Sequence, residues 1–438
     1  MAAKLLAAGS SQRPMTVPAT PDGAVPVAPR VHWIGALDPD LRRFDIILRT
    51  ANGTSYNAYA VRGSQGVAII DTVKIDFSEA FFGRLESIAD YDEITTVVLN
   101  HLEPDHSGAL PELLRRARRA TLLVSPQARL MLNGLFDPAD LAGRVAFVGS
   151  GDRADLGDRQ LQFLNTPYLH WPDTQCTWLA AEGILFSADF LGCHYCDSRL
   201  FNDAVGDFRF SFDYYYRHIM RPFGSYVRDA LDLIEALPLR VVAPAHGPIL
   251  RRDPLEYVAR YRALAARTVY GAATKTLAVF YVSAYGATRR MAEAVVAGAE
   301  SASTAAGEVR ISLHDLEGGE AAAFVDLIEE ADALVFGSPT INGDAVKPVW
   351  DLLSSLTVVD LKGKLGAAFG SYGWSGEAVP MIEERLRRLK LRVPLPGVRA
   401  RLAPTGNDFA ACHDLGREIS LQLLGRPTPR TFDLAQIS

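Results

Sequence analysis

Cysteine is scarce in this sequence, which limits the kinds of metal site that the chain can build. Only four cysteines occur in 438 residues, at positions 176, 193, 196 and 412. Cys193 and Cys196 form one closely spaced pair, and no second pair is present to complete a four-thiolate site. We therefore expect reduced thiols and exclude a fused rubredoxin-type domain.

Long apolar stretches are missing as well. The opening nine residues, MAAKLLAAG, are too short and too weakly apolar for the core of a signal peptide. No uninterrupted apolar span elsewhere reaches the length that a membrane helix requires. We therefore expect a cytoplasmic enzyme with no part in a membrane.

Positive charge is not in excess either. The formal net charge is −6, the sequence pI is about 5.9, and Lys and Arg form no run beyond short pairs. Binding to nucleic acid requires a basic face, so these values argue against that class of partner. The length predicts two or three domains, and a hydrophobic content of 48% is sufficient to bury their cores.

Potential metal ligands are concentrated in one short motif. His101, Glu103, Asp105 and His106 directly follow an apolar run, where a predicted strand ends and the chain turns. Sites in α/β folds form at such strand ends. Two imidazoles and two carboxylates suit iron, manganese or zinc better than copper(I) or an iron–sulfur cluster. For this motif taken alone, a polar surface turn is the alternative interpretation.

Three further candidate ligands follow predicted strands in the same way, namely His170, Asp189 and His246. A single histidine at any of these places is more often structural. Together with the first motif, however, they make seven ligands, which suffice for two metal ions that share one carboxylate.

The first half of the chain is predicted to be a mixed α/β domain. Residues 1–28 are rich in Pro, Ala and Ser without periodicity and suggest a flexible leader, so the domain spans 29–270. The β-rich runs that we expect to be strands are 44–48, 55–61, 66–70, 95–100, 122–124, 146–148 and 161–163, with helices at 77–88 and 109–120.

The second half has a different plan. After a polar helix from residue 254 to about 270, residues 271–275 are predicted to be a short linker. A continuous apolar strand at 277–282 then opens a regular alternation of strands and helices to about residue 430, typical of a doubly wound parallel sheet covered on both faces. The second domain is therefore predicted to span 276–430.

Three loops of the second domain are candidates for binding a flavin. Each leaves the carboxyl end of a predicted strand, and the first can hold one phosphate with hydroxyls, free N–H groups and a helix dipole. It offers no second pyrophosphate site, which favours FMN over FAD, although a simple helix cap is the alternative. The candidate residues are Ser283, Tyr285, Gly286, Ala287 and Thr288; Ser338, Pro339, Thr340, Ile341, Asn342 and Gly343; and Ser371, Tyr372, Gly373, Trp374, Ser375 and Gly376.

These motifs together resemble the flavodiiron proteins. The N-terminal half, with His-x-Glu-x-Asp-His at 101–106, is similar to a metallo-β-lactamase-like αβ/βα domain, and the C-terminal half is similar to a short-chain flavodoxin. The resemblance covers about residues 30–425. Zinc hydrolases of the first fold usually carry His-x-His-x-Asp-His. Glu103 stands where their second histidine stands, and a hard carboxylate favours a redox-active iron.

The resemblance implies a function and a ligand assignment. His101, Glu103 and His170 would hold one iron, Asp105, His106 and His246 the other, and Asp189 would bridge them. With FMN as the electron source, such a centre reduces dioxygen to water or nitric oxide to nitrous oxide. Two alternatives are a zinc hydrolase with a tethered flavin module and a non-catalytic flavin sensor or electron shuttle.

Further expectations concern the surroundings of the metals and the partners. Trp171, Asp173 and His194 lie beside predicted ligands and are candidates for orienting them or passing protons, with ordinary packing as the alternative. Without a fused rubredoxin or flavin reductase, the chain is expected to use a separate donor, such as rubredoxin or another small redox protein. The resemblance also implies a head-to-tail homodimer or a dimer of dimers.

Overall fold

The chain folds into two compact units, Met1–Ala265 and Ala266–Ser438. The computed structural model describes residues 21–44, 48–141, 143–266, 274–303, 307–319, 321–359, 361 and 363–427. Residues 1–20 of the expected leader and 271–273 of the expected linker therefore lie outside the described residues. Within the described part, no helix has the length and apolar character needed to cross a membrane.

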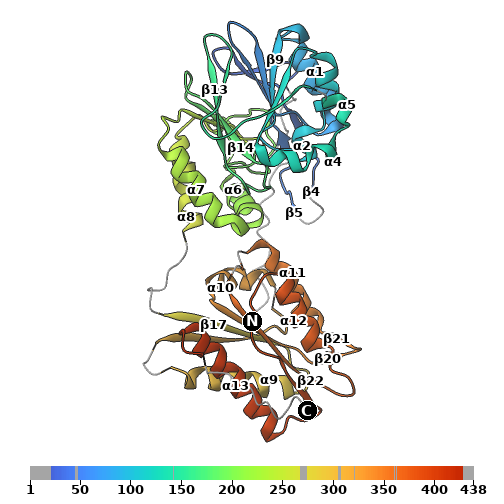
Figure 1. Cartoon of the computed structure of the whole chain (residues 1–438), viewed down its shortest axis with the longest axis vertical. Helices are drawn as coiled ribbons and strands as arrows, with labels where there is room; N and C mark the ends of the chain where they lie inside the picture. The colour runs from blue at the N-terminus through green and yellow to red at the C-terminus, as the bar shows by residue number, and fades with distance from the viewer. Residues whose placement is uncertain are drawn as a thin grey trace, which may run out of the picture. The chain divides into compact units, whose positions relative to one another are not determined.

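The first unit is built from two main sheets (Figure 1). The seven-stranded sheet has the order β1 (Val25–Ala28), β2 (Val31–Trp33), β7 (Tyr59–Arg62), β8 (Val67–Ile70), β9 (Ile94–Val98), β10 (Thr121–Val124) and β11 (Val145–Phe147). The five-stranded sheet has the order β12 (Arg153–Asp155), β13 (Gln160–Asn165), β14 (Gln175–Leu179), β15 (Ile184–Phe186) and β16 (Val241–Ala243).

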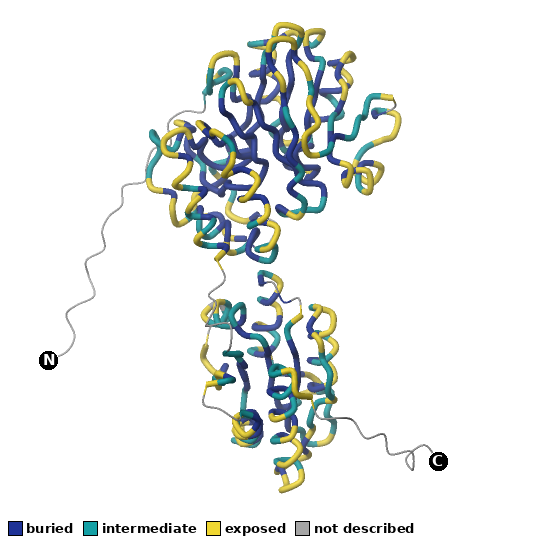
Figure 2. The backbone as a smooth tube through the Cα atoms, turned by 60° about the vertical axis from the view of Figure 1, so that its left-hand side comes forward, coloured by how far each residue is buried: buried dark blue, intermediate teal, exposed yellow. Residues whose placement is uncertain are grey.

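The two sheets pack face to face and helices cover their outer faces, which is the predicted αβ/βα arrangement. Ile70 and Val98 of the first sheet share one buried cluster with Phe163 and Phe186 of the second. The backbone in Figure 2 accordingly has its buried segments in the middle of the unit. The helices of the first sheet are α1 (Ser78–Glu86), α2 (Pro104–Ser107), α3 (Leu110–Arg116), α4 (Leu132–Leu135) and α5 (Pro138–Leu141). Those of the second are α6 (Arg209–Tyr215), α7 (Gly224–Glu235) and α8 (Pro254–Ala265).

Three expected boundaries in this unit were wrong. β1 lies at the end of the expected leader and pairs with β2, so residues 25–28 belong to the first sheet. The run 44–48 is not one strand, since β4 (Arg43–Phe44) and β5 (Leu48–Arg49) pair antiparallel around residues outside the described set. The run 55–61 is split into β6 (Thr54–Tyr56), which pairs with β3 (Ala36–Asp38), and β7 in the main sheet.

Asn57 explains the split between β6 and β7. Its side chain accepts a hydrogen bond from Nε1 of Trp33 at 2.9 Å and donates to the carbonyl oxygens of Pro244 and Gly247, each at 2.9 Å. The chain leaves one sheet and enters another at this residue. The same contacts attach the start of the first sheet to the turn that carries His246.

The second unit contains a five-stranded sheet in which every pairing is parallel, as predicted. Its order is β18 (Val309–Asp315), β17 (Lys275–Tyr281), β19 (Ala333–Gly337), β22 (Leu365–Tyr372) and β23 (Val398–Arg401). One face packs on α9 (Ala287–Ser301) and α13 (Gly406–Leu423). The other packs on α10 (Val325–Glu330), α11 (Lys347–Ser355) and α12 (Ala378–Arg388). The short β20 (Thr340–Ile341) and β21 (Asp344–Ala345) form a separate hairpin.

Candidate metal centre and flavin loops

The motif at 101–106 leaves β9 and ends in the single helical turn α2. Two residues after β8 hold this turn in place. Asp71 accepts a hydrogen bond from the backbone N–H of Asn100 at 2.7 Å, and Thr72 donates its hydroxyl to the carbonyl oxygen of His106 at 2.7 Å. Burial raises the pKa of Asp71 to about 6. The adjacent strand thus fixes the backbone at both ends of the motif.

One cluster of candidate ligands gathers around Glu103. Oε2 of Glu103 lies 3.1 Å from Nε2 of His101 and 3.1 Å from Nε2 of His170. Oδ2 of Asp189 lies 3.5 and 3.6 Å from the same two nitrogens. One ligand atom from each of these four residues lies within 4.8 Å of the others.

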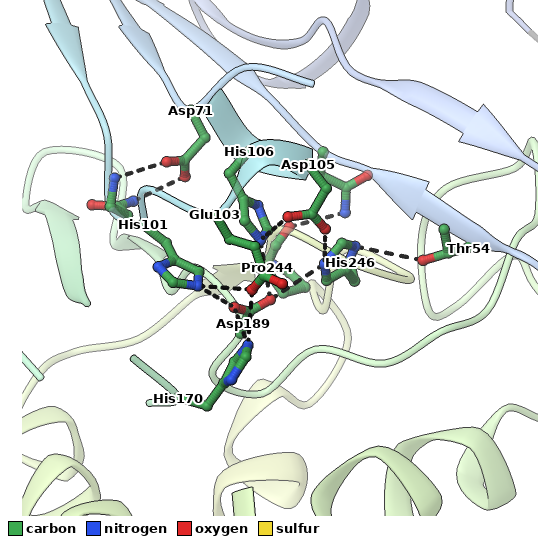
Figure 3. A network of polar contacts seen from close by, with 12 residues as sticks. Thr54, Asp71, His101, Glu103, Asp105, His106, His170, Asp189, Pro244 and His246 are labelled. Atoms are coloured by element: carbon green, nitrogen blue, oxygen red, sulfur yellow. Dashed lines mark hydrogen bonds and ion pairs between the residues drawn. The ribbon is translucent and has the colours of Figure 1, made fainter. Parts of the chain in front are cut away.

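A second cluster consists of Asp105, His106 and His246. Oδ1 of Asp105 lies 3.3 Å from Nε2 of His106, and Oδ2 of Asp105 lies 3.1 Å from Nε2 of His246. Oδ1 of Asp189 lies 3.4 and 3.3 Å from these two nitrogens. Asp189 therefore turns one oxygen toward each cluster, and Figure 3 shows it at the centre of the network.

Several buried polar atoms at the clusters have no hydrogen-bond partner among the described residues. They are both oxygens of Asp105, Oδ2 of Asp189, and Nε2 of His106 and of His246. Buried polar atoms are normally satisfied, so these atoms indicate a missing ligand. Burial opposes ionisation of Asp189, but His106 and neighbouring imidazoles outweigh it and hold the pKa of Asp189 well below its usual range. Two adjacent cations fit this set of nitrogen and carboxylate donors.

Neighbouring groups orient two of the imidazoles. Nδ1 of His101 lies 3.2 Å from Oδ2 of Asp173, which also accepts from the N–H of Leu102 at 2.7 Å. Nδ1 of His246 lies 2.7 Å from the carbonyl oxygen of Ser55. These contacts leave each Nε2 directed into the site, as is usual for metal-binding histidines. The ring of Trp171 packs edge-on against His101 at 5.1 Å.

His194 lies beside the second cluster. Its Nδ1 is 3.0 Å from the hydroxyl of Thr54, and its ring centre is 5.1 Å from that of His246. Burial, followed by the effect of His246, places the pKa of His194 well below its usual range. Its Nε2 has no hydrogen-bond partner among the described residues.

Sequence reasoning missed Tyr215. The hydroxyl of this buried side chain donates to Oδ1 of Asp189 at 2.9 Å. Burial, together with the charge of Asp189, raises the pKa of Tyr215 well above its usual range. Tyr215 comes from α6, in a segment with several aromatic residues, so nothing in the local sequence distinguishes it.

The first flavin loop lies between β17 and α9. Gly286 has φ of +82°, immediately before the helix, and a side chain there would be strained. The hydroxyl of Ser283 accepts from the N–H of Arg289 at 3.1 Å. Thr288 is buried, and its hydroxyl lies 2.9 Å from that of Ser371 in the third loop. The first and third loops are therefore in contact, although β19 lies between β17 and β22 in the sheet.

The second loop is the hairpin of β20 and β21. Asn342 and Gly343 form its turn with φ of 55° and 77°, typical of a type I′ turn. The hydroxyl of Ser338 is buried and donates to the carbonyl oxygen of Pro339, so this side chain supports the loop. By contrast, Tyr285 and Trp374 are 99% and 80% exposed. Two uncovered aromatic rings at adjacent loops suit the stacking of a flat ligand.

Comparisons with known proteins agree with both halves of this description. The family model described as ODP family beta lactamase matches residues 54–247, and the flavodoxin model matches residues 279–416. A type A flavoprotein from Rhodobacter capsulatus is 56% identical to this chain, over 95% of the chain and 96% of the relative. This chain belongs to the flavodiiron family of type A flavoproteins.

Two other relatives connect this flavodiiron protein to named activities. A nitric oxide reductase from Moorella thermoacetica is 33% identical over 91% of this chain and 98% of its own length. The solved rubredoxin oxygen:oxidoreductase from Desulfovibrio gigas is 26% identical, with a TM-score of 0.64, and the match covers 92% and 99% of the two chains. The predicted fold and the predicted cofactors, FMN and a non-haem diiron centre, are thereby confirmed.

Proposed function

We propose that this flavodiiron protein reduces dioxygen to water, nitric oxide to nitrous oxide, or both, at a diiron centre that receives electrons from FMN. The observation that carries the proposal is the placement of Asp189, which directs one oxygen toward each of two buried ligand clusters. The names of the relatives, an oxygen oxidoreductase and a nitric oxide reductase, support the same reaction classes.

The roles of the ligands follow from the two clusters. We assign His101, Glu103 and His170 to one iron and Asp105, His106 and His246 to the other, bridged by Asp189. When bound, the irons together with FMN would supply the electron-transfer chemistry of the reduction. The residues contribute geometry: burial excludes bulk water, the carboxylates favour the ferric state, and Asp173 with Ser55 fixes the direction of two imidazoles.

The test of this assignment is the replacement of Asp189. We expect about two irons and only trace zinc in the wild-type chain, and Asp189→Ala should lose iron and lower turnover more than about 100-fold. Asp229→Ala, an exposed aspartate on α7, is the matched control. Oxygen and nitric oxide electrodes measure both activities. Stoichiometric zinc with full activity, or wild-type turnover of Asp189→Ala, contradicts the proposal.

We also propose that the three loops hold FMN. The open backbone at Gly286 and the start of the 15-residue helix α9 support a single phosphate at the first loop. Gly286→Val should empty the flavin site, because a β-branched residue is strained at a φ of +82°. Extraction and chromatography of the flavin identify it. Full flavin content in this variant argues against the placement.

For the electron donor, we propose a separate small acidic redox protein such as rubredoxin, docking on the edge strand β23. β23 has the sequence Val-Arg-Ala-Arg, with Arg399 and Arg401 exposed and no Asp or Glu, in a chain of net charge −6. Arg399 and Arg401 pair in register with Gly370 and Tyr372 at the start of the third flavin loop, and Nε of Arg401 donates to the carbonyl oxygen of Gly373. Such a local basic edge steers an acidic partner toward the flavin.

The donor proposal predicts a salt-dependent affinity. Arg399→Glu with Arg401→Glu should weaken binding of oxidised rubredoxin about tenfold at low ionic strength, measured by calorimetry. Lys390→Glu with Arg392→Glu changes the net charge equally, but Arg392 pairs with Leu365 at the opposite end of β22, about 17–23 Å along the strand from the partners of Arg399 and Arg401. Equal weakening in both variants, or in neither, excludes this edge as the docking site.

Finally, we propose a cytoplasmic head-to-tail homodimer, alone or paired into a dimer of dimers, in which the flavin of one chain serves the metals of the other. Only nine residues, 266–274, separate the end of α8 from the start of β17, and this short connection supports the arrangement. A mixed dimer of Gly286→Val and Asp189→Ala chains should retain one working site. Pairing a doubly substituted chain with a wild-type chain should leave none. The reverse pattern of rates indicates transfer within one chain.

A further inference from the structure

Among the seven proposed ligands, His170 is held least by its surroundings. Its side chain is 14% exposed, whereas the other six are at most 9% exposed. Nδ1 of His101 and of His246 each have a hydrogen-bond partner, but within the described residues Nδ1 of His170 has none, and the same holds for Nδ1 of the fully buried His106. The direction of the His170 ring therefore depends on the loop that carries it.

That loop connects β13 and β14 and is closed by a tight turn. The backbone N–H of Tyr168 donates to the carbonyl oxygen of Trp171 at 2.7 Å, so His170 lies inside the turn. Tyr168 itself has φ of +64°, a conformation that is unfavourable for a large side chain. Such a conformation persists only where contacts around it compensate.

The compensating contacts come from the ring of Tyr168. It lies 6.0 Å from the ring of Phe223 in a stacked arrangement and 4.7 Å from the ring of Tyr226. These two residues precede and begin α7, which packs on the five-stranded sheet through its buried face. The turn that carries His170 is thus attached to α7 through the ring of Tyr168, in addition to the buried side chain of Leu169.

We propose that Tyr168 is a positioning residue, which holds the turn on α7 so that Nε2 of His170 meets the same metal as His101 and Glu103. This inference rests on the proposed ligand assignment. The contact that Tyr168 makes is apolar: the flat ring fixes the turn, and the hydroxyl is not required. A substitution that keeps the ring should therefore preserve the site, whereas removal of the ring should loosen one of the two metals only.

The experiment measures iron release from the full-length, flavin-loaded, reduced protein into an iron chelator. Tyr168→Ala should release one of its two irons about tenfold faster than wild type and the other at the wild-type rate. Tyr168→Phe should release both at the wild-type rates. Phe210→Ala is the matched control, because Phe210 is a 75% exposed ring on neighbouring α6 that stacks on Tyr214 and on no residue of the loop.

Two further variants separate the possible failures. His170→Ala should accelerate the release of one iron, and if it does not, the proposed ligand assignment fails. If His170→Ala has this effect while Tyr168→Ala leaves both rates unchanged or accelerates both equally, the positioning role alone is overturned. Should Tyr168→Ala fail to fold, Tyr226→Ala removes part of the platform from the helix side. Tyr226→Ala must then release one iron faster than wild type and the other at the wild-type rate. If both irons leave at unchanged or equally accelerated rates, the proposal is overturned.

Discussion

Single side chains at the metal centre take their properties from their neighbours. Glu103 is approached by two imidazoles and Asp189 by four, so carboxylates that burial alone would neutralise stay ionised. Burial raises the pKa of Glu103, but contacts with His101 and His170 reverse the shift and lower it below the usual range. Anionic oxygens are therefore in place before a metal binds.

The cysteines show the opposite effect of burial, which leads to a first prediction. Burial raises the pKa of Cys176, Cys196 and Cys412 to about 12 each, and it raises that of Cys193 further. At pH 8 a thiol with a pKa of about 12 is thiolate in only about one molecule in ten thousand. The native protein should show no fast reaction with a thiol reagent, and four thiols should react after unfolding. A fast-reacting native thiol contradicts this.

A second prediction concerns Tyr215. Tyr215→Phe removes the hydrogen bond to Oδ1 of Asp189 and leaves the ring packing intact. Because a hydrogen bond to a charged group contributes about 1.5–3 kcal/mol, we expect weaker iron retention and turnover lowered several-fold, without loss of fold. Metal analysis, turnover and circular dichroism measure the three quantities. Unchanged turnover and iron retention indicate that the hydroxyl has no role at the centre.

At the scale of elements, the packing of α9 on α13 depends on two glycines. A Cβ on Gly298 would lie 1.8 Å from the carbonyl oxygen of His413, and one on Gly416 would lie 1.9 Å from that of Val295. The two backbones approach so closely that no side chain fits between them. Since α9 begins at the proposed phosphate loop, this packing also positions the flavin site.

The third prediction tests this close approach. Gly298→Ala should destabilise the second unit by about 1–3 kcal/mol, because one of the helices must move. Gly406→Ala, at the start of α13 with nothing within 4 Å, should change stability by less than about 1 kcal/mol. Denaturant unfolding, monitored by the increase in flavin fluorescence, measures the free energy of unfolding of both variants. Equal stability of the two variants excludes the proposed steric conflict.

At the scale of the whole molecule, each of the two units has its own core and its own proposed cofactor. The fourth prediction is therefore two thermal transitions in calorimetry. Any ligand that binds only the folded state stabilises its own unit, so removing iron should lower one transition and removing flavin the other. A ligand present at a free concentration of 100 times its Kd raises the free energy of unfolding of its unit by about 2.7 kcal/mol. A single transition that responds to both cofactors contradicts independent unfolding.

The sequence by itself determined the fold classes, the order of the two units and the residues that gather in the clusters. These features are local: four candidate ligands occupy residues 101–106 after one strand, and each candidate flavin loop follows an apolar strand. Periodicity and turn chemistry act over a few residues, so they can be recognised without a structure. The same signals misplaced the strand breaks around Asn57, where contacts with a distant turn decide the path.

Only the tertiary structure decided which ligands meet and what supports them. Glu103 meets His170, Asp189 faces both clusters, and Ser55 and Tyr215 approach the site from strands and helices far away in the chain. No spacing predicts these contacts, because they depend on the order of strands in two packed sheets. The sequence supplies side chains at the strand ends, and the packing of the sheets brings those ends within a few ångströms of one another.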